Sequence, residues 1–97
     1  MITTVVNIKR EAYDVYIGRA GNGEDGYFGN PFVLKDPLDR AKILAQFKAY
    51  FDKRVQDDAQ FKRRVLALRG LKLGCFCKPL ACHGDIIAAY INATEGD

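Results

Sequence analysis

The sequence predicts an α/β fold in which a small Rossmann-like sheet of three to four short, mostly parallel strands is packed by three helices. Segments rich in β-branched and apolar residues near the N-terminus and at 71–77 have the composition of strands. Residues 37–56 and 85–93 repeat apolar side chains at helical spacing. A chain of 97 residues has the length of one domain, so we expect a single α/β domain over 1–97 with a frayed tail at 94–97.

Two short strands are expected in the first eighteen residues. Thr3–Ile8 is rich in β-branched residues, and Tyr13–Gly18 alternates aromatic or branched residues with others. The polar connection Lys9–Ala12 is then either a hairpin turn or a bulge. The glycine-rich segment Arg19–Phe32 is too long for a simple turn, which predicts a surface loop with a function.

The remaining elements follow from capping residues and apolar spacing. Asp36-Pro37 supplies an N-cap and a proline at the first helical position for the helix over 37–56. Asp57 or Asp58 can cap a second helix that ends before Gly70. The other face of this helix is basic, which is typical of a solvated surface and less often of a phosphate site. These basic residues are Lys62, Arg63, Arg64 and Arg69.

Composition and charge narrow the class of protein. Fifteen Lys and Arg against twelve Asp and Glu give a net charge of +3, a mild excess that suits an anionic ligand but is small for a protein that coats DNA. The three cysteines all lie within 75–82, and an odd, tight cluster favours a reducing compartment, which predicts a cytoplasmic protein, or one of the bacterial host cytoplasm if a phage encodes it. The N-terminus lacks the pattern of a secretion signal, and no long apolar run predicts a membrane span.

The candidate catalytic residues lie where the strand over 71–77 leads into the last helix. Loops at the carboxyl ends of strands usually bind ligands in open α/β sheets. A helix N-terminus stabilises an anion such as a phosphate or a thiolate, so we expect an acidic cysteine here. The catalytic hypothesis places a thiolate on Cys82 or Cys77, makes His83 the proton carrier, and uses Asp85 as the helix cap or the group that orients the imidazole.

Zinc is the alternative for the same residues. Cys75, Cys77, Cys82 and His83 provide four ligands of the right kind. In a regular strand, however, the Cα atoms of residues two apart, such as Cys75 and Cys77, are separated by roughly 6.6 Å. Two thiolate sulfurs that bind one zinc must approach to under roughly 4 Å. A free thiolate is therefore favoured over a metal, and Cys75 taken alone is more typical of a small core residue.

The glycine-rich loop offers a second half for this site. Backbone N–H groups and a guanidinium there could hold a phosphate. The candidate ligand-binding residues are Gly18, Arg19, Gly29, Asn30, Pro31 and, from the cysteine-rich turn, Lys78. The loop matches neither the P-loop pattern nor the dinucleotide fingerprint, which argues against a conventional ATPase or NAD enzyme.

Several blocks of the sequence resemble a family of small phage and bacterial proteins, domain of unknown function family 4326. The blocks are V-V-N-I-K, Y-I-G-R, G-N-P-F and L-G-C-F-C-K-P-L-A-C-H-G-D-I-I, and they span nearly the whole chain. The Cys-x-Cys-Lys-Pro-x-x-Cys-His-x-Asp segment is the hallmark of this family. The stretch Ala20–Phe28 is longer than the resemblance implies. The cysteine-rich ending also resembles that of another uncharacterised family of small Rossmann-like proteins, which implies work related to nucleotides or nucleic acids.

These observations lead to two functional hypotheses. The first is a small enzyme-like protein whose partner is a nucleotide, a nucleoside phosphate or a nucleic acid, which it hydrolyses or uses in group transfer. The second is a non-catalytic phage module that binds zinc or a partner and acts as an inhibitor. The first hypothesis requires Arg19 and His83 to meet across one cleft at the edge of the sheet.

Overall fold

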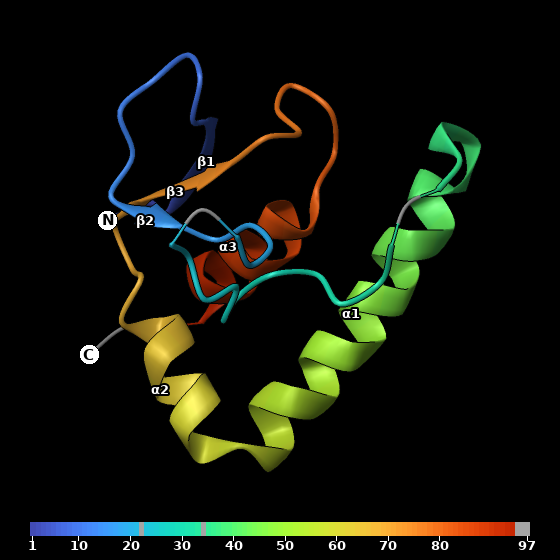
Figure 1. Ribbon diagram of the computed structural model, residues 1–97. Coiled ribbons are helices and arrows are strands. Elements are labelled where there is room, and N and C mark those ends of the chain that lie inside the picture. The colour runs from blue at the N-terminus through green and yellow to red at the C-terminus, as the bar shows by residue number, and fades with distance from the viewer. Residues whose placement is uncertain (22, 34, 95–97) are drawn as a thin grey trace.

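A computed structural model describes residues 1–21, 23–33 and 35–94, and it confirms the α/β fold (Figure 1). Within these residues the sheet has three strands, all parallel, in the order β1-β3-β2. The strands are β1 (Thr4–Asn7), β2 (Val15–Tyr16) and β3 (Lys72–Cys75). Each strand is shorter than predicted, because β-type composition continues into segments that leave the sheet.

The connection from β1 to β2 passes over the central strand. Both outer strands run parallel to β3 on either side of it, so the sequence-based choice between a hairpin turn and a bulge at 9–12 was wrong. Gly74 makes this crossing possible, since a Cβ atom there would lie 2.6 Å from Ile8 Cγ2 and 2.8 Å from Tyr13 Cγ. The side chains of the connection therefore cover this face of β3.

The predicted aspartates cap the two central helical segments, although α1 (Arg40–Asp57) itself begins three residues later than predicted, because a 3₁₀ turn precedes it. Asp36 accepts a hydrogen bond from the Leu38 N–H at the start of this 3₁₀ turn, η1 (Pro37–Asp39), which leads directly into α1. Asp58 caps α2 (Ala59–Leu66) by accepting from the Phe61 N–H at 3.0 Å. The helix α2 is shorter than predicted, and a series of turns connects it to Gly70, whose φ is +78°.

The last helix, α3 (His83–Ala93), starts two residues earlier than predicted and lies against β1 and α1. It approaches the sheet closely at Gly84, where a Cβ atom would lie 2.7 Å from Ile17 Cδ1. A core rich in aromatic side chains fills the space between the sheet and the helices. Its fully buried large members are Phe47, Phe51, Phe61, Ile17, Leu73, Ile87 and Ile91.

The predicted fraying of 94–97 falls, apart from Thr94, outside the described residues. Each helix in the described part of the chain is too short or too polar to cross a bilayer.

Candidate functional site

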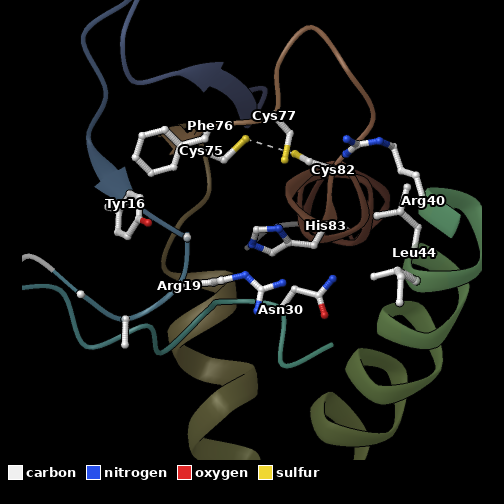
Figure 2. A pocket seen from close by; sticks show the side chains of 14 residues that line it. Tyr16, Arg19, Asn30, Arg40, Leu44, Cys75, Phe76, Cys77, Cys82 and His83 are labelled. Carbon is white, nitrogen blue, oxygen red and sulfur yellow. Dashed lines mark hydrogen bonds between the residues drawn. The ribbon is translucent and has the colours of Figure 1, made fainter. Parts of the chain in front are cut away.

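A cavity of about 370 Å³ opens where the cysteine-rich turn faces the glycine-rich loop, and it brings most of the predicted site residues together (Figure 2). β3 ends at this cavity with Cys75, α3 begins there with His83, and the segment after β2 brings Gly18 and Arg19. The predicted residues that line it are Gly18, Arg19, Asn30, Cys75, Cys77, Cys82 and His83. Arg19 and His83 therefore share one cleft.

The other predicted residues lie beside this cavity. Gly29 and Pro31 line a neighbouring hollow, whose lining also includes Arg19 and Asn30. Lys78 and Asp85 are outside the lining and form an ion pair with each other. Lys78 is thus held by a carboxylate.

Cys75 and Cys82 form a hydrogen-bonded pair of sulfur atoms. Their Sγ atoms are 3.2 Å apart, both residues are free cysteines, and Figure 2 shows the contact between the end of β3 and the start of α3. Cys77 is the third sulfur that lines the cavity and is only half buried. The buried pair can hold a single proton between its two sulfurs.

The proton of this pair belongs on Cys82. The pKa of Cys75 is lowered to about 6, first by the hydrogen bond from Cys82 and then by the backbone N–H groups of Cys77 and Lys78, against the opposing effect of burial. The same hydrogen bond and burial raise the pKa of Cys82 well above its usual range. The sequence analysis placed a thiolate on Cys82 or Cys77, whereas the directions of these two pKa shifts favour the negative charge on Cys75 and the proton on Cys82.

Two side chains hold the turn that stabilises this thiolate. Asn7 Nδ2 donates to the carbonyl oxygens of Lys78 at 2.8 Å and of Phe76 at 3.3 Å. Asp85 Oδ2 accepts from the Cys82 N–H at 3.1 Å, which makes Asp85 the cap of α3, one of its two predicted roles. Asn7 was missed from the sequence because its partners are backbone atoms about seventy residues away.

His83 is buried as a neutral imidazole. Its Nε2 lies 2.7 Å from the carbonyl oxygen of Ile17, and its ring packs edge-on against Phe47. Burial lowers the pKa of His83, and Arg19 adds to this effect. Since a carbonyl oxygen only accepts, Nε2 carries the proton and Nδ1 is left as a base. The carbonyl of Ile17, and not Asp85, orients the ring.

Two arginines flank the imidazole. Arg19 Nη2 donates to the Phe32 carbonyl at 2.7 Å, and Arg40 Nη1 donates to the Ala81 carbonyl at 3.1 Å. Among the described residues neither arginine has a carboxylate within ion-pairing distance. Figure 2 shows Arg19 and Arg40 on opposite sides of His83. Their remaining donors are therefore available to an anionic ligand.

Arg40 and Tyr16 are site residues that the sequence did not indicate. An arginine in the first turn of a helix is usually solvated, and no pattern separates Arg40 from the other charged residues of α1. Tyr16 lines the cavity with Phe76, and the two rings meet edge-to-face with centroids 6.1 Å apart. Tyr16 opens the Y-I-G-R block that carries the family resemblance, but nothing in that block gave the tyrosine a role in the site.

The arrangement gives the zinc alternative no support. Within the described ranges, no three His, Cys, Asp or Glu side chains converge so that they could hold a metal ion.

Gly29 closes the base of the glycine-rich loop. A Cβ atom at Gly29 would lie 2.7 Å from the carbonyl oxygen of Gly18 and 3.2 Å from Arg19 Cα, and neither backbone atom can move without displacing the strand end. The two ends of the loop are thus in direct contact, which places Arg19 next to Asn30.

We predict that stability falls on acidification between pH 8 and 5. The pKa of Cys75 and that of His83 are both lowered by folding, so the unfolded chain binds more protons than the folded chain across this range. Each proton of difference changes the free energy of unfolding by up to about 1.4 kcal/mol per pH unit. Urea denaturation at four pH values measures the slope. Cys75→Ser should flatten it between pH 8 and 6, and a wild-type stability that rises on acidification would contradict both assignments.

The fold and this site together define a class: small α/β proteins with a cysteine pair and an imidazole in an arginine-lined cavity at the carboxyl end of a parallel sheet. The chain belongs to the family described as Domain of unknown function (DUF4326), whose model matches residues 4–93. It is also similar to a protein of Enterobacteria phage T4 described as an uncharacterized 12.4 kDa protein in the nrdA-td intergenic region, with 40% identity over 88 residues that cover 91% of this chain and 76% of the phage protein. No solved structure matches the chain significantly.

Proposed function

We propose that the cavity binds the phosphate-bearing end of a nucleotide, free or in a nucleic acid, and that Cys75 and His83 perform hydrolysis or group transfer on it. One observation carries this proposal: the Cys75–Cys82 sulfur pair and His83 line the same cavity as Arg19 and Arg40, and no carboxylate of the described residues lies within ion-pairing distance of either arginine. Arginine donors bind phosphate in a fixed geometry, and the aromatic walls, Tyr16 and Phe76, suit a planar base.

The chemical step uses the sulfur pair as nucleophile and acid. Cys75 Sγ attacks an electrophilic carbon of the ligand, because a soft thiolate prefers carbon to phosphorus, and the phosphate serves as the anchor. The bond to the leaving group breaks, and the leaving group departs with the electron pair and takes the proton of Cys82. Water or an acceptor hydroxyl then attacks the same carbon, Cys75 leaves as a thiolate, and the proton of the attacking oxygen passes through His83 Nδ1 to Cys82. The enzyme is thereby restored.

Binding of nucleoside monophosphates tests the anchoring half of the proposal. Arg19→Gln and Arg40→Gln should each weaken binding at least about tenfold in calorimetric titrations, since a hydrogen bond to a charged group contributes about 1.5–3 kcal/mol. Lys62→Gln, which removes an exposed charge on α2, is the matched control and should leave the affinity within about twofold. Equal affinities for all variants, or no binding of any nucleotide by the wild type, would refute the proposal.

Product analysis tests the catalytic half. Chromatography of a panel of bound nucleotides should show conversion by the wild type and none by Cys75→Ser, which keeps the arginines and hence the affinity. Binding without conversion by the wild type would instead identify the non-catalytic module, in which the exposed Phe76 and Leu80 of the cysteine-rich turn are available to contact a partner.

A further inference from the structure

A second hollow of about 400 Å³ lies directly beside the first cavity. Arg19, Ala20 and Asn30 line both, so the two spaces are separated only by this short wall of the glycine-rich loop. A ligand that occupies both spaces would therefore contact Arg19 in each of them.

The second hollow, like the first, is lined by aromatic side chains and by arginines. Tyr27 and Tyr50 provide aromatic surface there, as Tyr16 and Phe76 do in the first cavity. Arg54 provides the cation. Its Nη1 donates to the Tyr50 hydroxyl at 2.7 Å, and its guanidinium lies 5.1 Å from the centre of the Tyr27 ring. The carboxylate that pairs with Arg54, that of Asp58, is 3.8 Å away, near the limit of an ion pair.

Arginine is the charged residue type that both spaces share. None of the described residues that line either of them is an aspartate or a glutamate. Arg40 and Arg54 lie on α1, and their separation of about 21 Å along the axis is close to four turns, so they project from nearly the same face of the helix. Arg19 is shared by the two spaces. Each of the two spaces is thus lined by an aromatic pair and by an arginine of its own, and Arg19 lies between them as a shared lining residue.

We infer that the ligand consists of two nucleoside units joined through phosphate, with the joining phosphate at Arg19 and one base in each space. This inference rests on the proposed function and specifies its substrate class. Aromatic surfaces alternating with cations are the arrangement that binds successive bases and phosphates of a single strand. A nucleoside monophosphate fills only one of the two spaces. Two sources provide the required chemistry: the end of a single-stranded nucleic acid, and a dinucleotide joined through pyrophosphate.

Affinities of the full chain for a graded set of ligands test the inference. The set is a nucleoside monophosphate, a 5′-phosphorylated dinucleotide with a phosphodiester link, and a dinucleotide linked by pyrophosphate, all at one salt concentration. At least one linked ligand should bind about fivefold or more tightly than the monophosphate, because its second base stacks on aromatic side chains. The linked ligand with the larger gain in affinity identifies whether the natural ligand is a nucleic-acid end or a pyrophosphate-linked dinucleotide. If neither linked ligand binds more tightly than the monophosphate, the inference is overturned while the proposed function stands. If even the monophosphate fails to bind, the proposed function fails.

A pair of arginine variants locates the second unit. Arg54→Gln should remove most of the gain of the linked ligand and leave the affinity for the monophosphate unchanged. Arg64→Gln is the matched control, since Arg64 also stacks on Tyr27, 3.6 Å from the ring centre, but does not line the hollow. Equal losses in the two variants would overturn the placement. The wild-type comparison needs no variant, so the inference can be refuted even if Arg54→Gln does not fold.

Discussion

Iodoacetamide should alkylate Cys75 at neutral pH far faster than it alkylates an ordinary cysteine. With a pKa of about 6, Cys75 is about nine-tenths thiolate at pH 7, whereas a free thiol with a pKa of about 8.5 is only a few per cent ionised. The thiolate fraction is therefore roughly thirtyfold larger. Although Cys75 is only 1% exposed, it lines a cavity of about 370 Å³, which a small reagent can enter. The rate as a function of pH, with the modified residue assigned by peptide mass spectrometry, measures the effect.

Two variants separate the sources of this acidity. Cys82→Ala removes the thiol that donates to Cys75, so the midpoint of the pH profile should move upward. Cys77→Ala removes the half-buried thiol, keeps the backbone N–H at that position, and should leave the midpoint in place. A wild-type midpoint near 8.5, or modification first at Cys77, would contradict the assignment of the thiolate to Cys75.

Phe47→Ala should lower the free energy of unfolding by about 3–5 kcal/mol, a large part of the stability of a domain of this size. Phe47 is 1% exposed, stacks on Phe51 with ring centroids 5.8 Å apart, and contacts the His83 ring with centroids 5.2 Å apart. The same truncation admits water beside the imidazole, so the pKa of His83 should rise toward its ordinary value. Urea denaturation and an NMR titration of His83, the only histidine, measure the two effects.

Phe76→Ala is the control for this prediction. Phe76 is 54% exposed, so its removal should change the free energy of unfolding by less than about 0.5 kcal/mol. Phe47→Leu retains most of the buried volume and provides a folded variant if the alanine variant does not fold. A pKa of His83 that stays unchanged in a folded Phe47 variant would show that the aromatic cluster does not control the imidazole.

The elements that could be predicted from the sequence are those specified by local interactions. Asp36-Pro37 and Asp58 mark helix starts through hydrogen bonds to residues two or three positions away, and apolar spacing identified α1. The order of the strands in the sheet is determined by contacts between residues far apart in the sequence. Nothing in residues 9–12 distinguishes a hairpin from a crossing over β3, because that choice is made by packing of Ile8 and Tyr13 on Gly74.

The candidate site likewise has features that could be predicted from the sequence and features that could not. Arg19 and His83 could be placed in one cleft because loops at the carboxyl ends of parallel strands share an edge. The location of the negative charge could not be predicted, since it depends on a sulfur contact and on N–H groups of the turn after β3. The orientation of His83 depends on the backbone carbonyl of Ile17, which any residue type would supply. Arg40 comes from a different helix and has no sequence signature.

The closed base of the glycine-rich loop has a consequence for how sequences of this kind can diverge. Because Gly29 lies against Gly18 and Arg19, the two ends of the glycine-rich loop are held together, whereas Gly23, farther out in the loop, has free space about it. Residues gained or lost near Gly23 change the outline of the molecule without altering the spacing of Arg19 and Asn30. Changes in loop length near Gly23 should therefore cost little stability. A single methyl group at position 29, by contrast, would push Gly18 and Arg19 away from Asn30.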